Sequence, residues 1–192
     1  YATVTTEDEE ILKSAAAPIV LLEACGTDRL PEAIAPGLRT IGFMLPTTPL
    51  HALLLRRMSR PVVMTSGNRS DAPQVTDDAD AREELSGIAT YALAHDRDIL
   101  NRVDDSVIRI AAGKMRVMRR ARGFAPAAIR LPNGFEQAPQ LLAAGGDLKN
   151  TFCFVKSGAA VLSQHIGDLT DARTFNDYTG TTSLYRAMID AR

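Results

Sequence analysis

The segment VIRIAAGKMRVMRR, residues 107–120, decides the fold class of this chain. Apolar residues alternate with charged or small ones in both of its halves, and this period of two is typical of β-strands. We therefore predict strands at Val107–Ala111 and Met115–Arg120, joined by a turn at Gly113–Lys114. The segment thus predicts a β-hairpin.

The residues on the amino-terminal side of this hairpin alternate between helical and strand patterns. Helical spacing predicts helices at residues 7–16, 50–58 and 77–85. Short apolar runs predict strands at residues 18–23, 38–45, 62–64 and 91–93. Because strands and helices interleave, the fold class is α/β with a mixed sheet.

The pattern changes after the hairpin. Proline and glycine punctuate residues 128–139 without any sustained periodicity, which indicates a linker. Strand-like runs follow at 141–144, 151–155 and 159–166, and they predict a three-strand meander that is too short to bury a core alone. The last stretch, 174–192, predicts a helix broken near Gly180. We expect domains at 1–130 and 140–192, with a linker at 131–139.

Composition limits the class of protein. The chain has 192 residues, of which 45% are hydrophobic, and this suits one domain and part of a second. There is no apolar run of ~20 residues and no secretory signal pattern. Cys25 and Cys153 lie outside any C-x-x-C spacing, so we expect two buried, reduced thiols in a cytoplasmic protein. The chain begins at Tyr1, and we expect it to be part of a longer protein.

Positive charge is concentrated in one part of the chain. Residues 101–130 contain eight of the 22 basic residues and only two acidic ones, whereas residues 1–100 contain 15 acidic and nine basic residues. Guanidinium groups bind phosphate oxygens in a bidentate geometry, so the cluster suits a phosphate-bearing ligand. The alternative is a solvated charged strand and loop.

Two polar segments add candidate ligand-binding residues. Thr65–Asn68 follows a predicted strand, and Ser66 and Asn68 there offer a hydroxyl and an amide beside Gly67. The alternative is a polar turn. The loop Gly145–Thr151 fits neither a Walker loop nor a dinucleotide fingerprint. Between two strands, however, its backbone N–H groups and the side chains of Lys149 and Thr151 could face a phosphate.

The paired acid Asp104–Asp105 precedes the hairpin and could hold Mg²⁺ or orient an arginine. The alternative is a turn capped by the two aspartates. Alternation places Ser106 on the face opposite Asp105 and Arg109, so only one set can line a pocket. His51 and His165 are each expected to be structural, because no second histidine stands at metal-ligand spacing.

In this order, the segments 41–51, 65–68, 95–97, 104–107, 119–126, 145–151 and 165–169 resemble the HypF family of hydrogenase maturation carbamoyltransferases. The resemblance implies the later part of a YrdC-like domain, a twisted mixed sheet with flanking helices. It also implies the first β-meander of an actin-like (ribonuclease-H-like) ATPase domain.

The same resemblance implies a reaction and its ligands. Carbamoyl phosphate is hydrolysed to carbamate, carbamate and ATP form carbamoyl adenylate, and the carbamoyl group passes to the C-terminal cysteine of the partner protein HypE. That product becomes the cyanide ligand of nickel–iron hydrogenases. Residues implied to bind nucleotide are Ser66, Asn68, Ser106, Arg109, Arg120 and Arg122 in the first domain, and Gly146, Lys149, Asn150 and Thr151 in the second. Asp105 is the candidate for Mg²⁺.

Several family features are absent from these 192 residues: the acylphosphatase domain, the paired C-x-x-C zinc segments and the first half of the YrdC-like domain. We therefore expect no zinc site here, and weak or no adenylation by the isolated chain. Two alternatives are an RNA-binding module and a non-catalytic piece that docks the partner's tail. The scarcity of aromatic residues, at 5%, argues against RNA.

Overall fold

The computed structural model describes residues 1–25, 30–70 and 72–191. The chain forms two compact units, each assembled from two segments. The first contains Tyr1–Met64 and Asp105–Phe124, and the second contains Thr65–Asp104 and Ala125–Arg192. The predicted end of the last helix, Arg192, lies outside the described residues.

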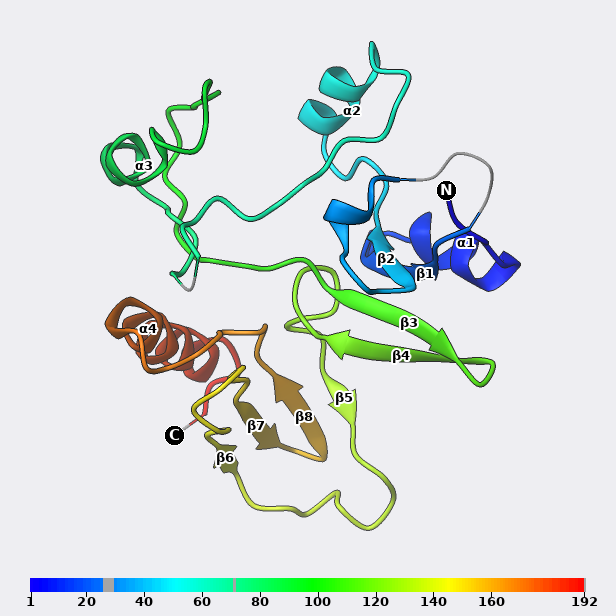
Figure 1. Ribbon diagram of the computed structural model, residues 1–192. Helices are drawn as coiled ribbons and strands as arrows, with labels where there is room; N and C mark the ends of the chain where they lie inside the picture. The colour runs from blue at the N-terminus through cyan, green and yellow to red at the C-terminus, as the bar shows by residue number, and fades with distance from the viewer. Residues whose placement is uncertain (26–29, 71, 192) are drawn as a thin grey trace. The chain divides into compact units, whose positions relative to one another are not determined.

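The first unit is built on a four-stranded sheet (Figure 1). Its strands are β1 (Ile19–Glu23), β2 (Thr40–Phe43), β3 (Val107–Ala111) and β4 (Lys114–Arg119), in the order β2-β1-β3-β4. β1 runs parallel to β3, and the other two pairings are antiparallel. The predicted α/β fold with a mixed sheet is therefore confirmed.

The predicted hairpin is β3–β4, with its turn one residue earlier than expected. Ala112 and Gly113 both have positive φ angles, +53° and +65°. Two successive residues of this conformation match the right-handed twist of the flanking strands. The sheet is anchored by Val20 and Ile108, whose side chains are fully buried.

The first unit also contains two short α-helices, each with an N-cap residue. α1 (Thr6–Leu12) begins with a capping box, in which Thr5 and Asp8 bond each other's backbone N–H. α2 (Pro49–Leu55) is capped by Thr48 and has proline in its first turn. A 3₁₀ turn, η1, spans Glu32–Ile34.

The second unit contains an antiparallel sheet of β5 (Ile129–Arg130), β6 (Leu141–Ala143), β7 (Cys153–Lys156) and β8 (Ala159–Leu162), in the order β5-β8-β7-β6. The predicted meander corresponds to β6, β7 and β8. β5 comes from the stretch that proline and glycine marked as a linker, so a short edge strand was missed there.

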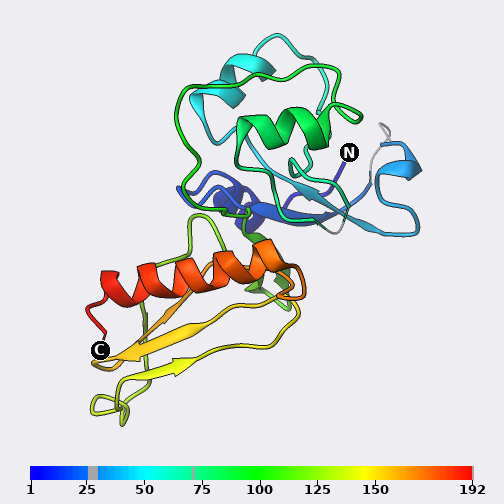
Figure 2. The ribbon, with the colours of Figure 1, turned by 90° about the vertical axis from the view of Figure 1, so that its left-hand side faces the viewer.

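Helix α4 (Ala172–Met188) lies along one face of this sheet (Figure 2). Phe152 is fully buried and makes edge-to-face contacts with Phe154, Tyr178 and Tyr185, with ring centroids 5.2–5.8 Å apart. The helix continues through Gly180, so the predicted break was wrong. A glycine costs only about 1 kcal/mol within a helix, and aromatic packing on both sides of it offsets that cost.

The second unit also contains α3 (Asp78–Leu85), a predicted helix that Asp77 caps. Residues 62–64, in the first unit, and 91–93, in the second, are not strands, so both of these predictions were wrong. Tyr91 is 91% exposed and Leu93 72% exposed. Apolar character predicts burial, but a strand also needs a second strand to which its backbone N–H and C=O groups can bond. Among the described residues, neither segment is paired with such a strand. Within the same residues, no helix is long and apolar enough to cross a membrane.

Candidate functional site

Three groups of polar residues are candidates for function. They are the turn at residues 119–124, which we call the arginine turn; the glycine loop at residues 145–151; and a small pocket beside α4.

Ser106 fixes the arginine turn from within the core of the first unit. Its side chain is fully buried, and Oγ accepts from the Ala121 N–H at 2.8 Å and donates to the Arg122 carbonyl at 2.9 Å. Both bonding directions of the hydroxyl are thus used by the protein. The structure gives Ser106 a framework position, and its predicted contact with nucleotide stays a prediction.

Arg122 connects the turn to two other segments. Its Nε and Nη2 donate to Asp105 Oδ1 at 2.9 and 2.7 Å, and Nη2 also donates to the Ala17 carbonyl at 2.9 Å. Gly123 allows this approach, because its φ is +88° and a Cβ would lie 2.5 Å from the Ala16 carbonyl oxygen. Arg122 remains 36% exposed, so part of the guanidinium faces solvent.

The other arginines of this region leave cationic surface. Arg119 donates to the Asp105 carbonyl at 2.9 Å, and Arg120 donates to the Phe124 carbonyl at 2.7 Å. Arg109 and Arg116 are exposed and stand directly opposite each other on β3 and β4. Like charges at opposed positions repel each other, so an anion bound there would relieve the repulsion.

Ser66 and Asn68 belong to the second unit. Ser66 is exposed, whereas Asn68 is half-buried and its Nδ2 donates to the carbonyls of Arg69 and Ala72, both at 2.9 Å. Asn68 Oδ1 is buried and has no hydrogen-bond partner among the described residues. A buried acceptor of this kind calls for a donor from water or a ligand. Whether these two residues meet the arginines at one nucleotide stays a prediction.

The glycine loop is held in shape by Asn150, whose side chain is 1% exposed. Its Nδ2 donates to the carbonyls of Ala144 and Gly146 at 3.0 and 2.7 Å. Lys149 has a positive φ of +50°, and its N–H donates to Asp168 Oδ1 at 2.7 Å. Asn150 therefore shapes the loop, while Gly146 and Lys149 are exposed and Thr151 is partly exposed.

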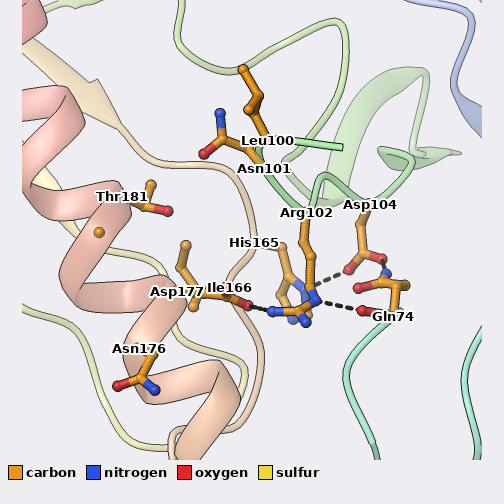
Figure 3. Close-up of a pocket in the computed structure, with 11 residues that line it drawn as sticks. Gln74, Leu100, Asn101, Arg102, Asp104, His165, Ile166, Asn176, Asp177 and Thr181 are labelled. Atoms are coloured by element: carbon orange, nitrogen blue, oxygen red, sulfur yellow. Dashed lines mark hydrogen bonds and ion pairs between the residues drawn. The ribbon is translucent and has the colours of Figure 1, made fainter. Parts of the chain in front are cut away.

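The pocket beside α4 was not predicted from the sequence (Figure 3). His165 Nδ1 lies 2.8 Å from Asp104 Oδ2, and Gln74 donates to the same carboxyl group. Arg102 forms an ion pair with Asp177, and its Nε donates to the Gln74 carbonyl. His165 had been expected to be structural, and no local pattern could reveal these contacts because the partners lie 61 and 75 residues apart.

These residues do not form a metal site on their own. No group of three or more His, Cys, Asp or Glu side chains converges within residues 1–25, 30–70 and 72–191. Asp105, the candidate for Mg²⁺, offers one carboxylate whose Oδ1 is already occupied by Arg122. Both cysteines were expected to be buried, but Cys25 is exposed, so that prediction was wrong for it. Cys153 is partly buried, and this burial raises the pKa of its thiol above the ordinary value.

Two family models match the chain. The Sua5/YciO/YrdC model, described as "Telomere recombination", matches residues 1–121, and the model of the HypF Kae1-like domain matches residues 136–192.

Curated relatives include carbamoyltransferase HypF of Rhodobacter capsulatus, 48% identical over 181 residues, which are 94% of this chain and 24% of the relative. The probable carbamoyltransferase HypF of Methanocaldococcus jannaschii is 35% identical over 176 residues, which are 91% of this chain and 23% of the relative. The chain thus spans about a quarter of the length of these relatives.

Two solved structures are similar. Full-length HypF in its phosphate- and nucleotide-bound form has a TM-score of 0.89 and 45% identity, and the match covers 97% of this chain and 29% of that one. HypF of T. kodakarensis also has a TM-score of 0.89, with 43% identity, and the match covers 97% of this chain and 24% of that one.

Proposed function

This chain belongs to the HypF family, and we propose that it forms part of an ATP-dependent carbamoyltransferase. The proposed sequence begins with carbamate, formed from carbamoyl phosphate. A carbamate oxygen attacks the α-phosphorus of ATP, which gives carbamoyl adenylate and releases pyrophosphate. The carbamoyl group then passes to the C-terminal cysteine sulfur of a protein partner, HypE, and AMP leaves.

The arginine turn is the observation that carries the first half of this proposal. Adenylation develops negative charge on the leaving pyrophosphate, and positioned cations stabilise that charge. Arg120 and Arg122 lie on a turn that is fixed from inside by Ser106, so little conformational order is lost when an anion binds. Arg109 on β3 adds a further exposed cation.

Each proposed contact follows from what the side chain exposes. Arg120 and Arg122 offer guanidinium N–H groups to phosphate oxygens. Ser66 offers an exposed hydroxyl, and Asn68 offers its buried Oδ1 to a hydroxyl or N–H donor of the ligand. Ser106 acts through the backbone of the turn, which orients the arginines.

The glycine loop is the proposed nucleotide contact of the second domain, which we place at residues 140–192 after a linker at 131–139. Lys149 and Gly146 are exposed, and Thr151 of the same loop is partly exposed. The backbone N–H groups of Lys149 and Asn150 are bonded to Asp168 and to the Gly167 carbonyl, so the side chains of Lys149 and Thr151 are the main proposed phosphate contacts. Asn150 contributes by fixing the loop's shape, because its amide is engaged with two loop carbonyls.

Magnesium enters the proposal only with the nucleotide. The described residues supply a single candidate carboxylate, Asp105, and Arg122 already engages it. The phosphates of ATP would therefore hold the ion, and we assign no step to it. An RNA-binding role is not favoured, since the curated relatives are carbamoyltransferases.

The experiment is ATP binding to the 192-residue chain by isothermal titration calorimetry. Arg120→Ala should weaken binding by about tenfold or more, because a charge-assisted hydrogen bond contributes ~1.5–3 kcal/mol. Arg186→Ala is the matched control, since Arg186 is an exposed arginine near the end of α4. Equal ATP affinity in both variants and the parent chain would contradict the proposal.

A second measurement concerns activity. Because the chain spans about a quarter of the length of its relatives, we propose that the isolated chain catalyses weak or no carbamate-dependent ATP–pyrophosphate exchange. Strong exchange would show that these residues alone contain a complete adenylation site.

A further inference from the structure

The pocket beside α4, which we call the α4 pocket, lies entirely within the second unit. We propose that it binds a small uncharged group carrying both N–H donors and a carbonyl acceptor, which is the carbamoyl class of ligand. The class rests on the proposed function, while the site rests on the geometry. Its lining comes from four segments: Gln74; Leu100, Asn101, Arg102 and Asp104; His165 and Ile166; and Asn176, Asp177, Gly180 and Thr181 of α4.

The charges of the α4 pocket are already matched. Arg102 pairs with Asp177, and Asp104 accepts from both Gln74 and His165. The side chains of Arg102, Asp177, Asp104 and His165 are only 16–30% exposed, so water screens their interactions weakly. A charged ligand would have to displace one of these partners. A neutral ligand with donors and an acceptor can be added without breaking either pair.

Donors and acceptors remain for such a ligand. Nδ1 of His165 is bonded to Asp104, so Nε2 is the ring nitrogen that remains for a ligand. The described residues give Nε2 no hydrogen-bond partner. Arg102 has N–H groups beyond the two that bond Gln74 and Asp177, and these can donate to a carbonyl.

The size of the pocket selects a small ligand. Its volume is about 130 Å³, whereas a single water needs roughly 10–15 Å³ by the same measure. Pockets for drug-sized ligands have roughly 300–1,000 Å³. By this measure the α4 pocket holds roughly ten water-sized groups, which suits a small ligand better than a drug-sized one.

The position of the pocket connects it to the proposed nucleotide loop. The Ile166 N–H donates to the Asn150 carbonyl at 2.9 Å, and the Asn150 N–H donates to the Gly167 carbonyl at 2.8 Å. One wall of the α4 pocket is thus hydrogen-bonded to the glycine loop. A carbamoyl group in the pocket would lie next to the loop that we propose to hold nucleotide.

The test uses biuret, a neutral probe with amide donors and carbonyls, titrated into the ¹⁵N-labelled 192-residue chain. We expect saturable shifts of the backbone amide signals of Ile166, Gly180 and Thr181. His165→Asn keeps an amide nitrogen where Nδ1 bonds Asp104 but removes Nε2, so it should weaken biuret binding by about fivefold. The control is His95→Asn, at an exposed histidine of the same unit, which should leave binding unchanged.

Thr181→Val provides a second variant that preserves side-chain shape, and it decides the outcome if His165→Asn disturbs the fold. The absence of a saturable shift in the parent chain would overturn the proposal. Unchanged biuret affinity in both His165→Asn and Thr181→Val, each shown to be folded, would overturn it as well. ATP titrations of the same samples separate the two proposals. Lost biuret binding with normal ATP binding refutes only the pocket, and the reverse result refutes only the nucleotide site.

Discussion

Ser106→Ala is the change that best separates a framework role from a ligand-binding role in the arginine turn. The serine hydroxyl is the hydrogen-bond acceptor of the Ala121 N–H, and both residues have no exposed surface. It also donates to the carbonyl of Arg122. Alanine fits the same space but removes both bonds.

The expected loss of stability depends on which backbone groups lose a hydrogen-bond partner. The Ala121 N–H becomes a buried donor without an acceptor, and this costs about 1–3 kcal/mol. The Arg122 carbonyl lies on a partly exposed residue, so water can replace the lost donor at little cost. We expect the free energy of unfolding of the first unit to fall by about 2 kcal/mol, which is roughly a 30-fold change in its folding equilibrium.

The assay is urea denaturation followed through the backbone amide signals of β3 and β4, which report on the first unit alone. Ser14→Ala is the matched control, because Ser14 is exposed in the first unit and its Oγ donates to the Ile11 carbonyl. Its effect should stay within about 0.5 kcal/mol. An unchanged slope with urea would show that both variants unfold from the same compact state.

One result would refute this reasoning. If Ser106→Ala leaves the stability of the first unit unchanged but abolishes ATP binding, the hydroxyl contacts phosphate and does not support the turn. If stability falls while the folded variant still binds ATP, the framework role is correct, and the sequence-based prediction of a direct contact is wrong.

Three further changes test other parts of the structure. Gly145→Ala should lower the free energy of unfolding by at least about 1 kcal/mol, because φ is +79° and the new Cβ would lie 2.5 Å from the Thr151 carbonyl oxygen. The control is Gly146→Ala, whose Cβ would have no atom within 4 Å, and it should change the stability to urea by less than about 0.5 kcal/mol. Phe152→Ala should lower stability by about 3–5 kcal/mol, measured by thermal unfolding, because it empties the centre of the second unit's core. Cys153 should react with a thiol reagent more slowly than the exposed Cys25. Burial raises the pKa of the Cys153 thiol, so its thiolate should become abundant only at a higher pH than for an ordinary cysteine. Mass spectrometry of the labelled protein across a pH series measures both rates.

The sequence predicted those elements whose signal is local. Alternation on both sides of a turn predicted the β3–β4 hairpin, and helical spacing predicted α1, α2 and α3. It predicted less well where a partner decides the outcome. Residues 62–64 and 91–93 have strand composition but no neighbouring strand, and α4 survives Gly180 because aromatic packing outweighs a local propensity.

The candidate site divides in the same way. The sequence by itself determined the family, the cationic turn and the glycine loop, because glycine positions and clustered arginines are visible in a linear chain. Only the tertiary structure decided that Ser106 and Asn150 are internal supports and that His165 faces Asp104. The physical reason is that a side chain's role depends on burial and on which distant group completes its hydrogen bonds, and chain folding alone sets both.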